Sequence, residues 1–450
     1  MRDLTALGAG TVVLAVFGMA VVQYFMPGGF DNAPGVNPGG LQQFAQSLGL
    51  TTLPSLSVEI FVWTWRLLIL AAWAGYAALL VSAHHTTSRR AHWVTPVVTG
   101  TPLALAFLFP PSLSADVYAY AGWGRMMALH AWNPYTHTLA ELAKLGDPAA
   151  ALIPVAAPSN HGPVWNLTAG TLVVLLGRAG VWGQVLALKL VAGVALVIAA
   201  FVARSITRTY EPQRADLTLL AVGLNPLLLI EGPGSGHNDI VMVAVMLAGL
   251  AAHARGARRA GYILVGLSAG VKFITLALVP WMIVSDVRER SASRAGAAAI
   301  IALGLALAPT VVAYAAFWEG RATFEGIRRV YEQKIDVGSD GPETNIGRGT
   351  SAARRERVGF VTRLVLLGLL HAGVTLAILR RPANDMPLAG WSWFALLLAW
   401  VVMPVTFCWY MIWPWSTTLT RWSAPNRPVL IASGVLSLFL TWVYTVRLAG

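Results

Sequence analysis

The feature that most constrains this chain is a series of long apolar runs, which begin at its first residues and continue to its last. A helix needs about 20 apolar residues to cross a bilayer, and only helices or closed barrels satisfy every backbone polar group there. Only 12% of the residues are charged, whereas soluble domains carry about 25%. We therefore predict one all-α, polytopic integral membrane protein over residues 1–450, with roughly 12 crossings, some of them short or re-entrant.

The charges of the chain indicate a membrane rather than nucleic acid as its surroundings. The 32 basic and 20 acidic residues give a formal net charge of +12, and in membrane proteins such an excess gathers in cytoplasmic loops. The first apolar run, 4–26, is too long for a signal-peptide core, so we interpret it as a retained span. Cys408 is the single cysteine, which excludes an intrachain disulfide.

The basic residues also predict the face on which each loop lies. Arg2 and Arg89 mark cytoplasmic segments, while segment 27–57 contains no Lys or Arg. Counting the crossings from the cytoplasmic N-terminus, which we call the parity of the loops, places Asp116 on the extracytoplasmic face of the plasma membrane. A later run, 217–230, returns to the same face.

Two stretches do not fit a simple alternation of crossings. Runs 164–176 and 185–203 precede Arg204, which must be cytoplasmic under the positive-inside rule, so we interpret the first run as re-entrant; the alternative is an exception to the rule. Run 261–285 is too short for two full spans, and we predict a broken hairpin with Lys272 near its tip. Lys272 then either faces a cavity or reaches an interface.

The loop 318–357 carries eight cations and lies outside by parity. Either the parity is wrong by one crossing, or residues such as Arg328 and Arg329 bind an anionic ligand. We divide the single domain into a catalytic module, 92–290, which includes a first outer loop, 111–163, and a set of C-terminal helices, 291–450.

The stretch 114–135 is the centre of the chain, and Asp116 is its only acidic residue. Read as a helix, it places Asp116, Tyr120 and Trp123 on one stripe. Because Tyr and Trp suit the membrane interface, we predict a helix that lies on the membrane surface and presents a carboxylate able to act as a general base. The alternative is that Asp116 caps its own helix.

A second polar group follows the run 217–230. His237, Asn238 and Asp239 offer one imidazole and one carboxylate, which are too few for a zinc site, and a helix N-cap is an equal alternative. The chain has no phosphate-binding loop or dinucleotide fingerprint. We expect no metal and no cofactor.

In order along the chain, these residues resemble the motifs of membrane glycosyltransferases of the GT-C class. The nearest similarity is to actinobacterial polyprenol-phosphate-mannose-dependent α-1,6-mannosyltransferases of lipomannan assembly, over residues of about 100–415. His161 stands where that family usually has Tyr. The matching residues are Asp116, Tyr118, Tyr120, Arg125, Asn133, Tyr135, His161, His237, Asn238, Asp239, Lys272, Trp409 and Tyr410.

The resemblance implies a metal-independent, inverting transferase with Asp116 as its base and the other matching residues in substrate binding. It implies a polyprenyl-phosphate mannose donor, a mannan or glycolipid acceptor and an α-1,6 linkage. Another lipid-linked sugar is an alternative donor. A lipid-linked sugar transporter is a further alternative, although the sequence shows one broken hairpin without a matching half.

Overall fold

The computed structural model describes residues 2–25, 55–84, 92–153, 155–288, 291–329, 351–380, 386–399, 408–420, 422 and 427–447. All regular secondary structure in these ranges is helical, as predicted. The longer helices are α1 (Arg2–Gln23), α3 (Val58–His84), α4 (Val94–Leu108), α5 (Asp116–His130), α8 (Pro163–Leu176), α9 (Gly180–Tyr210), α12 (Asp239–Ala254), α13 (Arg258–Ala269), α14 (Leu278–Val287), α15 (Ala292–Ala315), α17 (Ser351–Arg380), α18 (Met386–Leu397) and α20 (Arg427–Arg447).

Short helical segments connect these helices. They are α6 (Leu139–Lys144), α7 (Pro148–Leu152), η2 (Gly177–Ala179), η3 (Pro212–Arg214), α10 (Ala215–Gly223), α11 (Pro226–Leu229), η4 (Ile230–Gly234), η5 (Phe273–Ala277), η6 (Gly320–Phe324), η8 (Cys408–Met411) and α19 (Ile412–Thr418).

Four described helices, α1, α3, α9 and α15, are long and apolar enough to cross a membrane. A fifth crossing results if the segments 212–223 and 226–234, which are bent by 46° relative to each other, form one span. Further apolar helices of 10–17 residues, including α4 and α8, are too short to qualify alone. The protein is therefore a helical membrane protein, and the count of roughly 12 crossings stays a prediction.

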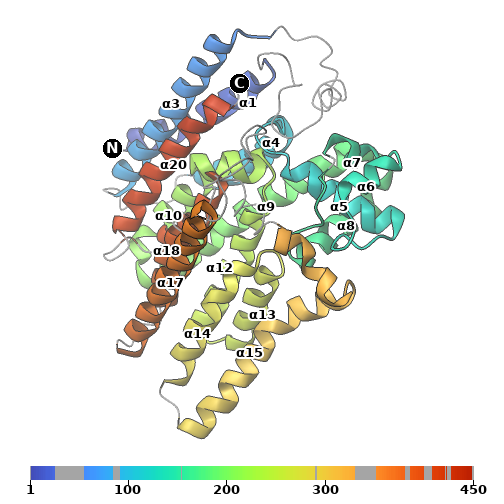
Figure 1. Cartoon of the computed structure of the whole chain (residues 1–450). Helices are drawn as coiled ribbons and strands as arrows, with labels where there is room; N and C mark the ends of the chain where they lie inside the picture. Colours follow the sequence, from blue (N-terminus) through green and yellow to red (C-terminus); the bar gives the residue numbers. More distant parts are fainter. Residues whose placement is uncertain are drawn as a thin grey trace.

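The helix α9 lies at the centre of the arrangement and contacts α4, α5, α8, α10 and α12. In Figure 1, α1, α3 and α20 run side by side, α5–α8 form a cluster away from them, and α13 lies beside α15. Small residues line the inner face of α9, where Gly193 approaches the carbonyl of Pro102 in α4 so closely that an added Cβ would lie 3.1 Å away. Such close backbone contact is typical of helices that pack in membranes.

The run 217–230, predicted as one continuous span, is broken instead. Its first helix, α10, ends at Gly223, and the side chain of Asn225 then accepts hydrogen bonds from the Leu227 and Leu228 amides at the start of α11. Pro226 follows this cap at the first helical position, where a missing N–H costs nothing. The π-helical turn η4 then leads toward His237.

The broken hairpin predicted over 261–285 is confirmed as two short helices. The first, α13, ends at Ala269, and Lys272 adopts an extended conformation, with φ −146° and ψ 125°, before η5 and α14. The loop before α8 joins this break, because the Val164 amide donates to the Gly270 carbonyl over 2.9 Å. With 14 residues, α8 is shorter than a full span, and its re-entrant course stays a prediction.

The helix α5 forms where the sequence indicated, but its rings are not available to a membrane. Tyr118 and Tyr120 are 0% exposed and Trp123 is 4% exposed, because α7, α8 and α9 pack around the helix. The interpretation that these rings meet lipid is therefore wrong. They belong to the protein core, and the position of α5 at a membrane surface stays a prediction.

We expect Gly266→Ala to destabilise the protein, because α13 and α15 touch backbone to backbone there. A Cβ on Gly266 would lie 2.1 Å from the Ala306 carbonyl oxygen, so the helices must separate. Such overpacking costs about 1–3 kcal/mol, measurable as a lower unfolding temperature in detergent. Gly304→Ala on α15 is the control, because a Cβ there meets nothing within 4 Å. Equal unfolding temperatures for the two variants would contradict this packing.

Candidate active site

Five segments far apart in the sequence meet around Asp116. They are the first turn of α5, the loop before α8, the loop between η4 and α12, the break between α13 and η5, and η8. Gly236, with φ of +79°, permits this meeting. A Cβ on Gly236 would lie 2.9 Å from the Val117 side chain and 3.0 Å from that of Lys189, so only glycine lets the loop approach α5.

The Asp116 carboxylate points to neighbouring side chains rather than to the backbone amides of its own helix. Its Oδ2 lies 3.4 Å from Nδ1 of His237 and 3.3 Å from the Tyr120 hydroxyl. The backbone amide of Asp116 donates instead to the Ser114 hydroxyl over 3.2 Å, and no cap by the Asp116 carboxylate is present at the start of α5. The capping alternative is therefore wrong. The Asp116 side chain is 35% exposed, so one side of the carboxylate is open to a substrate.

Charge around Asp116 favours its ionised form. Burial alone raises the pKa of this carboxyl, but the hydrogen bond and charge of His237, together with the charge of Lys272, outweigh burial and hold the pKa well below its usual value. At neutral pH, Asp116 is thus an anion that can accept a proton.

His237 is fully buried between two carboxylates. Its Nδ1 faces Asp116, and its Nε2 lies 3.3 Å from Oε2 of Glu231. Burial lowers the pKa of His237, but the hydrogen bonds and charges of Asp116 and Glu231 outweigh it and raise the pKa to about 9. The indole of Trp409 stacks on the imidazole at a centroid distance of 4.2 Å and an angle of 21°. His237 is accordingly a cation at neutral pH, held in place on its edges and one face.

A neutral polar chain extends from the other side of Asp116. The Tyr120 hydroxyl lies 3.3 Å from Oδ1 of Asn238, and Nδ2 of Asn238 lies 3.4 Å from Nδ1 of His161. Burial lowers the pKa of His161 to about 4, against the opposing charge of Asp116, so its imidazole is neutral. The His161 ring also packs edge-on against Tyr120 at 4.9 Å. His161, which replaces Tyr in the resembling family, therefore retains an aromatic and hydrogen-bonding position here.

Asp239 and Lys272 form a largely buried ion pair behind this chain. The Lys272 Nζ lies 2.7 Å from both Asp239 oxygens, and Nε1 of Trp413 donates to Oδ1 over 2.5 Å. Asp239 is 0% exposed, while the Lys272 side chain is 19% exposed and lies 5.8 Å from the Tyr410 ring. Asn238 and Asp239 make no side-chain cap at α12, so that alternative is wrong. In the described part of the chain, no three His, Cys, Asp or Glu residues are grouped so as to hold a metal ion.

Four other predicted site residues act as supports around this centre. The Tyr135 hydroxyl donates to the His161 carbonyl over 2.9 Å, and the Tyr118 hydroxyl donates to Pro111 over 2.9 Å. Arg125 pairs with buried Asp147 at 2.9 Å. The Asn133 amide donates to the carbonyl of Phe317 and the carboxylate of Glu319. Their predicted contacts with a substrate stay predictions.

Arg328 and Arg329 are exposed on a short helical segment, 325–329, where both pair with Glu325. The closest distances are 2.7 Å from Arg328 and 2.9 Å from Arg329, and Arg329 also donates to the Ala156 carbonyl. Their predicted contact with a donor phosphate stays a prediction. The rest of the loop as far as residue 350 lies outside the described residues.

Glu231 is the residue that sequence reasoning missed. It is 2% exposed and contacts both His237 and the thiol of Cys408. A usable signal was present, because Glu231 is the only charged residue between Asp216 and Asp239, and an ionisable side chain in an apolar run marks a functional site by default.

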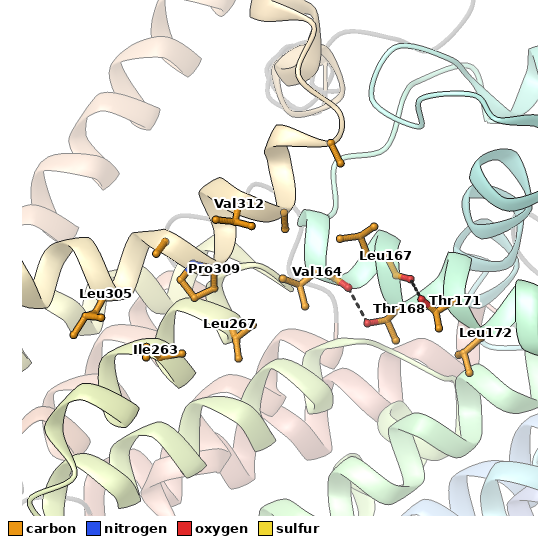
Figure 2. A pocket seen from close by; sticks show the side chains of 13 residues that line it. Val164, Leu167, Thr168, Thr171, Leu172, Ile263, Leu267, Leu305, Pro309 and Val312 are labelled. Carbon is orange, nitrogen blue, oxygen red and sulfur yellow. Dashed lines mark hydrogen bonds between the residues drawn. The ribbon is translucent and has the colours of Figure 1, made fainter.

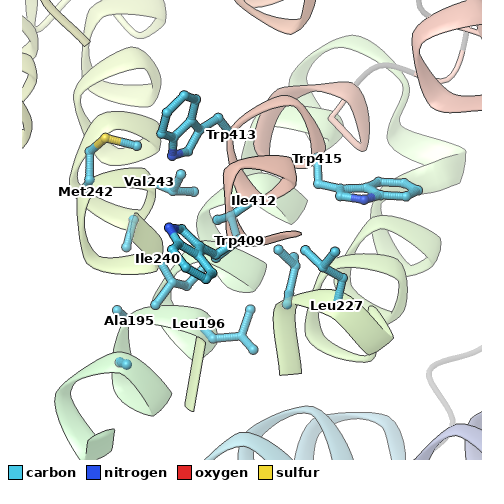
Figure 3. Close-up of a cluster of buried hydrophobic side chains, with 14 of the residues drawn as sticks. Ala195, Leu196, Leu227, Ile240, Met242, Val243, Trp409, Ile412, Trp413 and Trp415 are labelled. Atoms are coloured by element: carbon cyan, nitrogen blue, oxygen red, sulfur yellow. The ribbon is translucent and has the colours of Figure 1, made fainter. Parts of the chain in front are cut away.

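Apolar side chains pack beside the polar centre, and we call the tryptophans among them the aromatic floor. Figure 3 shows Trp409, Trp413 and Trp415 from η8 and α19 among apolar residues of α9, α11 and α12. All three indoles are at most 7% exposed. The C-terminal part of the chain thus contributes directly to the centre, and the division into a catalytic module, 92–290, and C-terminal helices stays a prediction.

An apolar groove of about 790 Å³ begins beside the centre and runs between α8, α13 and α15 (Figure 2). Val164 at its start is bonded to Gly270, two residues before Lys272. The groove walls include Leu267 and Val312, and its two threonines donate to carbonyls of their own helix, so it offers almost no polar partner.

The comparisons with known proteins agree with a membrane-embedded mannosyltransferase of the GT-C class. A family model described as "Alpha-(1->6)-mannopyranosyltransferase, N-terminal domain" matches residues 8–288, and one described as "Glycosyltransferase family 87" matches residues 230–404. The first covers more than half of the chain. The chain therefore belongs to the alpha-(1→6)-mannopyranosyltransferase family.

Two curated relatives are similar. Alpha-(1→6)-mannopyranosyltransferase A of Mycobacterium tuberculosis is 26% identical over 408 residues, which are 86% of this chain and 75% of that protein. Alpha-(1→6)-mannopyranosyltransferase B of Corynebacterium glutamicum is 27% identical over 170 residues, which are 37% of this chain and 26% of that protein. No solved structure matches the chain.

We expect Asp239→Asn to lower the unfolding temperature in detergent, because it leaves Lys272 beside a neutral amide. Removing one partner of a buried ion pair costs about 3–5 kcal/mol. The double variant Asp239→Asn with Lys272→Met should recover part of the loss. Glu325→Gln is the control, since its arginine partners are solvent-exposed and we expect no change. Equal shifts for Asp239→Asn and Glu325→Gln would contradict this assignment.

Proposed function

We propose that this protein is an inverting transferase that moves a mannosyl residue from a polyprenyl-phosphate donor to a mannan or glycolipid acceptor, forming an α-1,6 linkage. The observation that carries the proposal is the ionised, partly exposed Asp116 carboxylate, held by the buried His237 cation where five segments meet. Membership in the mannosyltransferase family supports the reaction class.

In the proposed reaction, the acceptor hydroxyl attacks the anomeric carbon of the donor sugar. The new carbon–oxygen bond forms as the bond from that carbon to the phosphate oxygen breaks, and the phosphate leaves with the electron pair. Asp116 takes the hydroxyl proton. The positive charges of His237 and Lys272 lower the energy of the transition state by attracting the departing phosphate. These residues perform the proton transfer and the charge stabilisation without a cofactor.

The apolar groove suits the isoprenoid chain of such a donor. It starts at Val164, next to the hairpin break that carries Lys272, so a chain in the groove brings its phosphate toward that cation. Inside a bilayer such a chain is held by van der Waals contact with the groove walls, since it leaves lipid rather than water on binding. We place membrane lipid or the donor chain, rather than a sugar, in this groove.

We expect Asp116→Asn to remove nearly all transfer activity, because it preserves the shape of the side chain and deletes the base. General-base catalysis contributes about 10²–10⁴ in rate, so kcat should fall by that factor while donor KM changes little. The measurement is radiolabel transfer in membranes with defined polyprenyl-phosphate sugars. The matched control is Asp216→Asn, another aspartate in the first turn of a helix, which is exposed and pairs with Arg204.

The same assay separates the proposal from its alternatives. Wild-type turnover by Asp116→Asn would end the assignment of Asp116 as the base. Loss of activity in EDTA with recovery in Mn²⁺ or Mg²⁺ would contradict a metal-independent reaction. Transfer from arabinose or glucose donors but not from mannose would favour another lipid-linked sugar, and movement of labelled lipid without transfer would favour a transporter.

We propose that the active site faces the extracytoplasmic side of the plasma membrane. The supporting observation is the distribution of basic residues in the sequence, which places Asp116 and Asp239 outside and Arg255 inside. Arg89, the other predicted cytoplasmic marker, lies outside the described residues.

Single-cysteine labelling on a Cys408→Ala background should show this orientation. We expect a membrane-impermeant maleimide to modify Asp116→Cys in intact cells and Arg255→Cys only after the inner face is opened. Arg255 is the internal control, because both sites are measured with the same reagent. Labelling of position 116 only in opened cells would reverse the proposed topology.

A further inference from the structure

Glu231 is a buried carboxylate to which the proposed reaction assigns no task. It lies in the π-helical turn η4 and is 2% exposed. Single π-helical turns are rare and occur often at functional sites, because they shift the side chains that follow. A carboxylate in such surroundings needs a cation or strong donors, since burial of an unpaired charge is costly.

Two groups face the two oxygens of Glu231, one as a charge partner and one as a hydrogen-bond donor. Oε2 lies 3.3 Å from Nε2 of His237, and Oε1 accepts from the Cys408 thiol at 2.7 Å. The carboxylate is therefore fixed on both sides and lies on the far side of His237 from the Asp116 carboxylate.

Asp116, His237 and Glu231 form a line of anion, cation and anion. Each ring nitrogen of His237 faces a carboxylate at ion-pair distance, and the two negative charges together favour the imidazolium over the neutral imidazole. The indole of Trp409 covers one ring face at 4.2 Å and limits tilting. Glu231 thus determines both the charge of His237 and the direction of its Nδ1.

We propose that Glu231 is a positioning residue for the transfer: it holds His237 as an imidazolium whose Nδ1 orients the Asp116 carboxylate toward the acceptor hydroxyl. This inference rests on the proposed role of Asp116 as the base. Glu231 does not touch the reacting atoms, and it acts through His237 alone.

A purely structural role predicts a different result. If Glu231 only satisfied the Cys408 thiol and filled the core, its replacement would change stability but not the pH dependence of turnover. The charged or titratable groups that face His237, its direct partners or the adjoining Gly236 are Asp116 on α5, Glu231 in η4, Cys408 in η8, His161 before α8, Lys272 after α13 and Lys189 on α9. Of these, Asp116 and Glu231 are the carboxylates that raise the pKa of His237.

The test is Glu231→Gln, which is nearly isosteric and removes the charge. We expect kcat to fall by about 10²-fold, because small misplacements of a catalytic group have effects of that size, with donor KM nearly unchanged. With one carboxylate lost, His237 deprotonates at lower pH. The decline of activity on the alkaline side, expected near pH 9 in the wild type, should therefore move toward neutral pH.

A double-mutant cycle with Asp116→Asn separates this inference from the proposed function. If Glu231 acts by orienting Asp116, Glu231→Gln should lower kcat by a much smaller factor in the Asp116→Asn background than in the wild type. In that background, only the effect of the His237 charge on the phosphate is left to lose. Activity of Asp116→Asn at the wild-type level would overturn the proposed function itself. An inactive Asp116→Asn beside a Glu231→Gln variant with wild-type kcat and pH profile would overturn this inference alone.

Glu231→Asp provides a second test if Glu231→Gln does not fold. The shorter side chain keeps the charge but withdraws it from Nε2 of His237, so we expect a smaller loss of kcat and a smaller shift of the alkaline limb in the same direction. Unchanged kcat and an unchanged alkaline limb in a folded Glu231→Asp protein would also overturn the inference. Asp216→Asn serves again as the control for a carboxylate outside the centre.

Discussion

The structure depends above all on compensation of buried charge. Glu231 and Asp239 lie in an apolar interior, where an unpaired carboxylate is costly, and each has a cation within 3.3 Å. These cations, His237 and Lys272, come from different segments. Contact between these carboxylates and cations requires breaks in the helices, at η4 and between α13 and η5. A continuous helix would satisfy the backbone hydrogen bonds more simply.

Packing of apolar side chains holds these breaks in the helices in position. The aromatic floor of Trp409, Trp413 and Trp415 carries polar tips at selected points, as the Trp413 indole donates to Asp239 and the Trp415 indole donates to Ser437. Trp413 and Trp415 therefore each contribute a large apolar surface and one directed hydrogen bond, and Trp409 contributes its stacked face to His237. Removing a ring would loosen a charge contact as well as a packing contact, which couples the stability of the floor to the geometry of the centre.

The sequence predicted the residues of the centre better than their contacts. Apolar length and charge determine where helices form, so α5, α9 and the broken hairpin at Lys272 were predictable. The break within 217–230 was not predicted, although Asn225 and Pro226 are residues that favour a helix start. The run is apolar on both sides of the break, so its hydropathy gives no sign of the bend. Helical spacing also placed Asp116 and Tyr120 together correctly, but it cannot show what surrounds them.

Glu231 shows why contacts between distant segments remain out of reach. It is six residues from His237, and the fold brings its other partner, Cys408, from 177 positions away. No period in the sequence encodes that pairing. Arg125 shows the same limit, since its motif position predicts substrate binding, while a partner that the fold adds, Asp147 at 2.9 Å, is not readable from the sequence. Motif membership indicates that a residue matters, and only the three-dimensional contacts distinguish supports from reacting groups.

The charge on His237 also bears on how the proposed base works. An imidazolium beside Asp116 lowers the pKa of the carboxyl and makes Asp116 a weaker base. A sugar hydroxyl is far too weak an acid to lose its proton to such a group in the ground state. Its acidity rises sharply once its oxygen has begun to bond to the anomeric carbon, because positive charge then develops on that oxygen. In the proposed reaction, a weak but fixed base therefore accepts the proton late, and the same cation would attract the departing phosphate, so such an arrangement favours transition-state charge over ground-state deprotonation.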